Sequence, residues 1–303
     1  TFCALKAAQK DLKIAHKRIH VLQQEVRLAK TRYTAGGTLK ADVLSLQARL
    51  SKARAQQTQT RAEVESARAA LAVLLGIPPE HAPQVSTLDS LPVEVPPSYQ
   101  EALAYAAAHH PALARAREKA RKARLGLDLA WASYLPRLSA QGHYYHDDPH
   151  MEYSRNRENW TLGVMLDWEL FSGFRRQAKV DKAQASLAAT RAENTKTIQR
   201  IRQNITQDLA RLKAAEDRLT ATRKQVAQAQ EALRLVRIRF QGGSAALTRF
   251  LAAELASHEA LANQNAAHYA LLRAKAALAQ DIGAWHQHHT HAVHTPPQSA
   301  SSP

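Results

Sequence analysis

Residues 198–243, IQRIRQNITQDLARLKAAEDRLTATRKQVAQAQEALRLVRIRFQGG, decide the fold of this chain. Apolar residues recur in this stretch at every seventh position: Ile198, Ile205, Leu212, Leu219, Val226, Leu233 and Phe240. A seven-residue apolar repeat is typical of a coiled-coil helix, whose apolar seam packs against another helix. Because residues 150–295 contain no proline, we expect one long helix over residues 176–240 that ends at Gly242-Gly243.

The same pattern opens the chain and indicates an internal repeat. Leu5, Leu12, Ile19, Val26 and Tyr33 have the same spacing and precede Gly36-Gly37. Residues 1–76 can be laid over residues 208–283 without a gap, which matches the Arg-aromatic-x-x-Gly turn at 32–36 with that at 239–243. Each copy continues through a second helix to Gly76 or Gly283. We expect these glycines to end helices in the left-handed conformation, which other residues resist.

The joints divide the chain into four parts. We expect residues 1–76 to be the C-terminal part of a first repeat, 77–97 a proline-rich linker, 98–283 the second repeat and 284–303 a disordered tail rich in His, Pro and Ser. Within the second repeat we expect a helix, a β-hairpin at about 136–171, the long helix 176–240 and a return helix over 244–282. The first repeat lacks the matching upstream portion, so the sequence is expected to be N-terminally incomplete.

One segment carries a strand pattern with an apolar face. Between Asn159 and Leu170 the apolar residues Trp160, Leu162, Val164, Leu166, Trp168 and Leu170 alternate with mainly polar ones. Residues 137–144 alternate in the same way and predict the preceding strand. Two tryptophans bracket the apolar face, as interface residues bracket a transmembrane β-strand of about 10 residues. We therefore predict that this face contacts lipid. The alternative is a soluble hairpin packed on a helix.

Composition argues against several classes of protein. The chain has 42 Lys and Arg against 26 Asp and Glu, a single cysteine, and a net charge of +16. One cysteine excludes an internal disulfide framework. Ser, His and acidic residues form no catalytic motif, so we expect no enzyme activity and no cofactor. The histidines between 286 and 294 could bind metal ions, but a flexible tail sets no geometry, so no metal site is predicted. Basic helix surfaces such as 115–124 could track nucleic-acid phosphates, although no aromatic stacking platform accompanies them.

The order of these motifs resembles the TolC-like outer-membrane efflux proteins. The resemblance rests on Tyr134-Leu135-Pro136-Arg137-Leu138 at the strand start, on Trp168 to Phe174 leading into the long helix, and on the two Arg-aromatic-x-x-Gly turns. It implies a mainly α protein whose long antiparallel helices form a periplasmic α-barrel. Each protomer of a homotrimer would give two hairpins to a twelve-stranded outer-membrane β-barrel in contact with lipid.

The family resemblance also implies a function and a set of contact residues. The protein would be a passive exit duct of a tripartite efflux or type I secretion system, docked to a periplasmic adaptor and an inner-membrane transporter. By position, the residues facing the adaptor would be Arg32, Tyr33, Gly36, Arg239, Phe240 and Gly243. The alternative for these residues is that the aromatics finish the seam and the arginines stabilise helix ends. The alternative for the whole chain is a soluble basic coiled-coil scaffold or nucleic-acid-binding protein.

Overall fold

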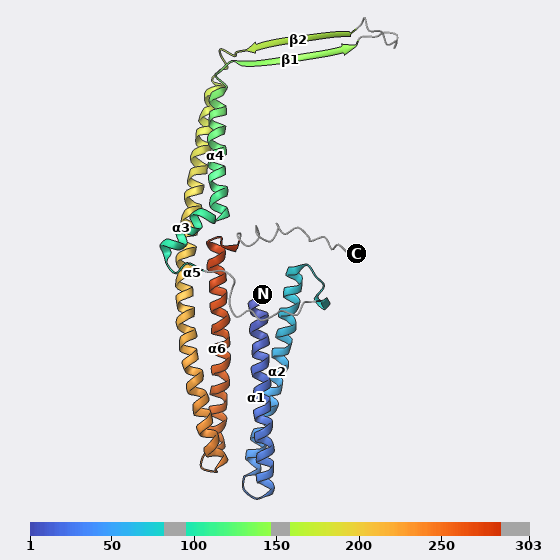
Figure 1. Ribbon diagram of the computed structural model, residues 1–303, viewed down its shortest axis with the longest axis vertical. Helices are drawn as coiled ribbons and strands as arrows, with labels where there is room; N and C mark the ends of the chain where they lie inside the picture. Colours follow the sequence, from blue (N-terminus) through green and yellow to red (C-terminus); the bar gives the residue numbers. More distant parts are fainter. Residues whose placement is uncertain (82–94, 147–157, 286–303) are drawn as a thin grey trace, which may run out of the picture. The chain divides into compact units, whose positions relative to one another are not determined.

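The structure is a computed structural model that describes residues 1–81, 95–146 and 158–285. Its elements in chain order are α1 (Phe2–Thr34), α2 (Lys40–Leu75), the 3-10 turn η1 (Pro79–His81), α3 (Tyr99–His109), α4 (Pro111–Ala132), β1 (Arg137–His146), β2 (Glu158–Asp167), α5 (Arg175–Gln241) and α6 (Leu247–Asp281) (Figure 1). This confirms the predicted mainly helical fold with one β-hairpin. Within the described residues, no helix combines the length and the apolar character needed to cross a membrane.

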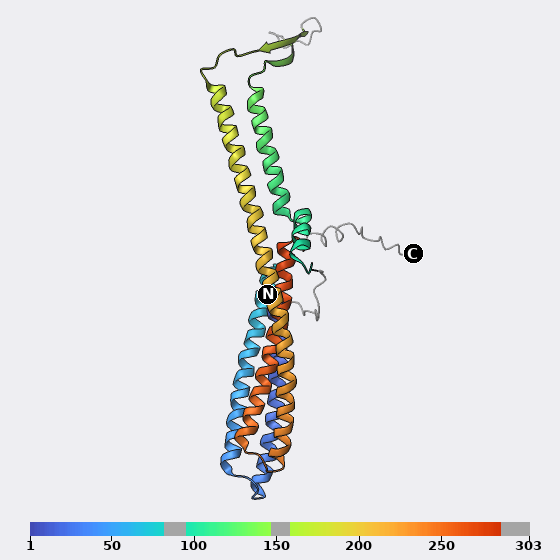
Figure 2. The same ribbon diagram turned by 90° about the vertical axis from the view of Figure 1, so that its left-hand side faces the viewer.

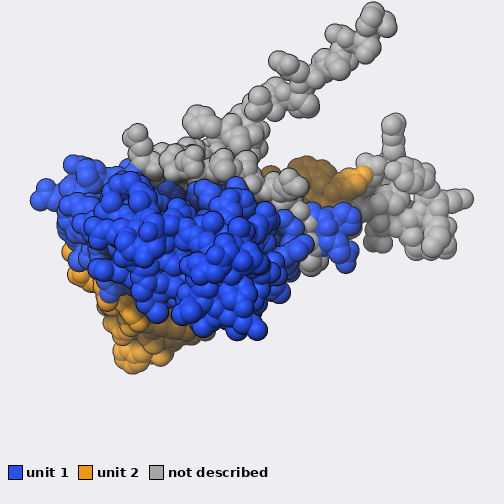
Figure 3. Space-filling view, turned by 90° about the horizontal axis from the view of Figure 1, so that it is seen from below, with its two compact units in different colours: residues 1–106, 204–303 blue, residues 107–203 orange. Residues whose placement is uncertain are grey.

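The chain divides into two compact units, coloured separately in Figure 3. The first contains residues 1–106 and 204–303, and the second contains residues 107–203. This division does not follow the repeat boundary expected at residues 77–97. The reason is that α5 belongs to both units: Asn194 in its first part hydrogen-bonds the carbonyl of Ala116 in α4, whereas Phe240 near its end stacks on Phe250 of α6.

Two helical hairpins, α1–α2 and α5–α6, make up most of the first unit (Figure 2). Their turns have the same hydrogen bonds, displaced by the repeat. The N–H of Gly36 donates to the carbonyl of Tyr33 at 3.0 Å, and that of Gly243 donates to the carbonyl of Phe240 at 3.1 Å. Gly36 has φ +73° and Gly243 has φ +76°. Left-handed glycines therefore reverse both hairpins, as the sequence predicted.

The core of the first unit joins the two hairpins. Buried residues of α1, α2 and α6 form one cluster: Ile19, Leu22, Val26, Ala29, Val43, Leu46, Leu50, Ala53, Leu247 and Phe250. Leu233, Val236 and Phe240 of α5 pack against this cluster. The heptad seam of α5 is buried at Ile205, Leu219 and Val226.

The structure breaks the single helix expected at the start of the second repeat into α3 and α4. The break falls at His110, whose backbone is extended, with φ −73° and ψ 120°. The side chain of His110 caps α4, because its Nδ1 atom accepts a hydrogen bond from the backbone N–H of Ala112. Pro111 is the cause, because proline disfavours the helical conformation in the residue before it and suits the first position of a new helix.

The second unit carries the β-hairpin. β1 and β2 pair antiparallel from Arg137 opposite Asp167 to His146 opposite Glu158. The strand predicted to reach Leu170 therefore ends three residues earlier. Pro136 precedes β1 and has no N–H to donate, so the ladder has no partner beyond Asp167. Trp168 lies outside the strand, where its indole Nε1 donates to the carbonyl of Tyr134 at 3.3 Å.

Candidate functional site

The tips of the two hairpins meet through Arg32. This side chain extends from the last turn of α1 to the C-terminal end of α5, where its guanidinium donates to the carbonyls of Phe240 and Gln241. Carbonyls at the end of a helix have no partner within the helix and carry the negative end of the helix dipole. Arg32 therefore caps the helix of the other hairpin and not its own.

A buried carboxylate lies beside this contact. The Oε1 atom of Glu25 lies 3.6 Å from Nε of Arg237 and accepts a hydrogen bond from Nε2 of Gln241 at 3.4 Å. Burial raises the pKa of Glu25, and the charges of Arg237 and Arg32 and the bond from Gln241 oppose that shift. The tips are therefore linked by a charged cluster of α1 and α5 residues.

The predicted tip residues divide into two groups. Arg32, Phe240 and Gly243 line a cavity of about 310 Å³ between the turns, together with Glu25 and Asp42. Phe240 stacks on Phe250 with ring centroids 5.1 Å apart, as its place in the seam requires. The other three residues do not line this cavity. Tyr33 is 45% exposed, Arg239 is exposed, and Gly36 is at the turn itself with open space around the position of a Cβ.

Sequence reasoning did not single out Glu25, Gln241 or Arg237. A signal for Glu25 was present, because it lies seven residues before Arg32 and therefore on the same face of α1. Arg237 and Gln241 offered no comparable signal, because their importance depends on the neighbouring hairpin.

Further contacts between the hairpins lie along the helices. Arg18 of α1 donates to both carboxylate oxygens of Glu254 on α6, at 2.8 and 3.1 Å. The Nδ2 atom of Asn265 on α6 donates to Oδ1 of Asp11 at 2.7 Å and to the carbonyl of Ala7 at 2.9 Å. The side chain of Arg18 is 13% exposed and that of Glu254 is 4% exposed. Polar contacts that are largely withdrawn from water therefore hold α1 against α6.

The second candidate site is the apolar face of the β-hairpin. The register places Leu138, Ala140, Gly142 and Tyr144 opposite Leu166, Val164, Leu162 and Trp160, so all eight share one face. Trp160, Leu162, Val164 and Leu166 are 75%, 72%, 71% and 65% exposed. The last two predicted members, Trp168 and Leu170, follow the strand and are exposed as well.

Among the residues that the structure describes, no group of three or more His, Cys, Asp or Glu side chains could hold a metal ion. The tail histidines His286, His288, His289, His291 and His294 lie outside the described residues.

The described chain thus combines long paired helices, two left-handed glycine turns and an exposed apolar β-hairpin. The family model described as "Outer membrane efflux protein" matches residues 102–284, which is more than half of the chain. This chain therefore belongs to the outer membrane efflux protein family.

Two curated relatives and a solved structure agree with this assignment. The chain is 25% identical over 221 residues to the outer membrane efflux protein BepC of Brucella suis, covering 73% of this chain and 48% of that protein. It is 28% identical over 170 residues to the alkaline protease secretion protein AprF of Pseudomonas aeruginosa. That match covers 55% of this chain and 35% of AprF. The crystal structure of the outer membrane protein VceC from Vibrio cholerae has the same fold, with a TM-score of 0.73 at 20% identity, over 93% of this chain and 67% of that one. The chain thus spans about half or less of these curated relatives.

Proposed function

We propose that the full-length protein is a channel subunit in the outer membrane, acting as the exit duct of a tripartite efflux or type I secretion system. In this proposal it forms a homotrimer, its β-hairpins contact lipid, and its helices extend into the periplasm. It performs no chemistry and binds no cofactor, because transport energy comes from an inner-membrane transporter. Nucleic acid is not among the expected partners.

The observation that carries the proposal is the exposure of the apolar hairpin face. A hairpin packed on a helix in a soluble protein would bury Leu162, Val164 and Leu166, but each is at least 65% exposed. Both strands have 10 residues, which suits the hydrocarbon core of a bilayer. An exposed apolar surface of this kind is unfavourable in water and favourable in lipid. The alternative, a soluble coiled-coil protein, therefore gives no reason for these exposed apolar residues.

We further propose that the tip cluster keeps the helical end of the duct narrow until a periplasmic adaptor docks. Arg32 joins the α1–α2 hairpin to the end of α5, and Arg237 joins α5 back to Glu25. Separating the hairpins requires these contacts to break together. The exposed residues Tyr33 and Arg239 are available to a partner at the same end. They are our candidates for the adaptor contact.

A face-specific substitution tests the membrane assignment. In the full-length protein, Val164→Arg places a charge on the apolar face and is expected to cost roughly 2 to 4 kcal/mol if the site meets the bilayer core. Thr161→Arg is the matched control, because Thr161 is exposed on the opposite face of the same strand. Membrane fractionation and the yield of folded trimer are the measurements. Equal losses for both variants, or recovery of the unmodified protein without detergent, would contradict the proposal.

A further inference from the structure

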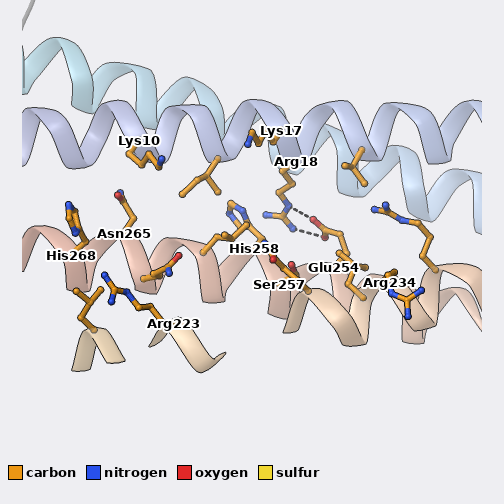
Figure 4. A pocket seen from close by; sticks show the side chains of 18 of the residues that line it. Lys10, Lys17, Arg18, Arg223, Arg234, Glu254, Ser257, His258, Asn265 and His268 are labelled. Atoms are coloured by element: carbon orange, nitrogen blue, oxygen red, sulfur yellow. Dashed lines mark hydrogen bonds and ion pairs between the residues drawn. The ribbon is translucent and has the colours of Figure 1, made fainter. Parts of the chain in front are cut away.

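A groove of about 740 Å³ runs between α1, α5 and α6 in the first unit (Figure 4). Its lining combines apolar side chains with basic ones. Ile14, Leu219, Leu233 and Leu261 supply apolar surface, and Tyr269 adds an aromatic ring. The volume lies within the range of about 300 to 1,000 Å³ that is typical of sites for drug-sized ligands.

Cations greatly outnumber carboxylates in this groove. Lysines and arginines from two helices line it: Lys10, Lys17 and Arg18 on α1, and Arg223, Arg234 and Arg237 on α5. Among the described residues that line it, Glu254 alone carries a carboxylate, and Arg18 already holds both of its oxygens. The groove therefore keeps a strong excess of positive charge.

Three of the cations have no counter-charge among the residues that the structure describes. Arg234 pairs with Glu231 at 2.7 Å, and Arg237 lies 3.6 Å from Glu25. By contrast, no ion pair or hydrogen bond links the side chains of Lys10, Lys17 or Arg223 to any residue within 1–81, 95–146 and 158–285. Each is exposed and available to a ligand.

The groove also contains polar groups that lack partners. His258 lines it from α6, and its buried Nδ1 atom has no hydrogen-bond partner among the described residues. Burial lowers the pKa of His258, and the charge of Arg18 lowers it further, while the charges of Glu254 and Glu259 oppose the shift. One concave, partly apolar site thus contains excess positive charge from α1 and α5. It also contains the unsatisfied Nδ1 atom of His258 on α6.

We infer that this groove binds an organic anion of drug-like size, with an apolar or aromatic body and carboxylate, sulfonate or phosphate groups. The apolar lining suits the body, while Lys17 and Arg223 are placed to neutralise the anionic groups from opposite helices. The inference does not depend on the proposed channel function.

Two dyes with one scaffold test the charge preference. Fluorescein is an anion and rhodamine 123 is a cation, and both are planar xanthenes of similar size. We would titrate the full-length protein in a non-ionic detergent with each dye, follow fluorescence polarisation, and subtract a detergent blank. Saturable binding of fluorescein, weakened by added salt, is the expected result, with little binding of rhodamine 123.

Paired variants locate the binding site. Lys17→Gln with Arg223→Gln is expected to weaken fluorescein binding about tenfold, the scale of losing charge-assisted hydrogen bonds. Lys13→Gln with Arg218→Gln is the matched control, because these exposed residues lie on the same two helices but do not line the groove. Lys17→Arg with Arg223→Lys should retain binding. Circular dichroism checks the fold of each variant, and Lys10→Gln probes the same groove if the first pair loses helicity.

Three outcomes would overturn the inference. The first is equal affinity for both dyes, which would indicate apolar adsorption. The second is an equal loss in the groove pair and the control pair, which would indicate a general effect of net charge. The third is the absence of saturable binding, as expected if another protein segment covers the groove in the assembled protein.

Discussion

Replacing Arg18 by methionine should loosen the contact between the two helical hairpins. The side chain of Glu254 is only 4% exposed, so its carboxylate would lose both hydrogen bonds from Arg18 while remaining largely buried. Removing one partner of a buried ion pair typically costs about 3 to 5 kcal/mol. Because the side chain of Arg18 is 13% exposed and water can enter from the groove, we expect the lower end of that range, about 3 kcal/mol.

The companion variants separate the pair from its surroundings. Glu254→Met should cost only about 1 kcal/mol, because the long Arg18 side chain can turn its charge to the groove. The double variant Arg18→Met with Glu254→Met should lie within about 1 kcal/mol of the unmodified protein, since neither charge remains buried. The two single losses would then exceed the double loss by about 3 kcal/mol, which is the coupling energy of the pair.

Hydrogen exchange measured peptide by peptide is the suitable assay, because it reports local opening without requiring the whole protein to unfold. Peptides around Arg18 on α1 and around Glu254 on α6 should lose protection together in the single variants, and the β-hairpin should be unaffected. The reasoning would be refuted by a coupling energy below about 1 kcal/mol, the value of an ordinary exposed ion pair. Faster exchange confined to one of the two helices would refute it equally.

Three smaller predictions concern the tips and the groove, and hydrogen exchange measures each of them. Gly36→Val and Gly243→Val should each lower the stability of the tips by about 1 to 2 kcal/mol, because both glycines have a left-handed backbone. Gly36→Asn should cost less, since asparagine tolerates this conformation better. An equal loss for valine and asparagine would contradict this. Phe240→Ala should cost about 2 kcal/mol through loss of the ring stacked on buried Phe250. An effect no larger than that of Phe240→Leu would show that the aromatic stack does not contribute. In the folded protein the pKa of His258 lies below its usual 6.5. As the pH falls below 6.5, His258 therefore takes up a proton in the unfolded chain before it does so in the folded protein. The folded α6 loses stability over this range, until the pH reaches the pKa of His258 in the folded protein. His258→Gln should abolish that acid-induced loss, and a pH profile unchanged by the substitution would count against the lowered pKa of His258.

Local features could be predicted well from the sequence because each depends on neighbouring residues. The seven-residue spacing predicts the seam of α5, and the displaced glycines predict two turns with matching hydrogen bonds. The alternating pattern from Trp160 onwards likewise places one apolar face on the hairpin, since residues two apart in a strand point the same way. The end of β2 was missed because it depends on the partner strand, where Pro136 stops the ladder.

The contacts between hairpins could not be predicted in the same way. Arg18 and Glu254 are separated by 236 positions, and Arg32 and Gln241 by 209. In the sequence, each is one charged or polar residue among many on a helix surface, and only packing decides which of them meet. The same holds for the groove, whose cations come from two helices and become a cluster only when α1, α5 and α6 pack together.

The acceptors of Arg32 are main-chain carbonyls. Only a substitution of Arg32 itself therefore removes the contact directly. Substituting Phe240 or Gln241 leaves their carbonyl oxygens in place, unless the new residue distorts the end of the helix. A random screen for alleles that loosen the tips should therefore recover changes at codon 32 far more often than changes that act through this contact at codon 241. Second-site suppressors of an Arg32 allele should also be rare at positions 240 and 241, because a donor on α5 itself could cap these carbonyls but would not link α5 to the α1–α2 hairpin.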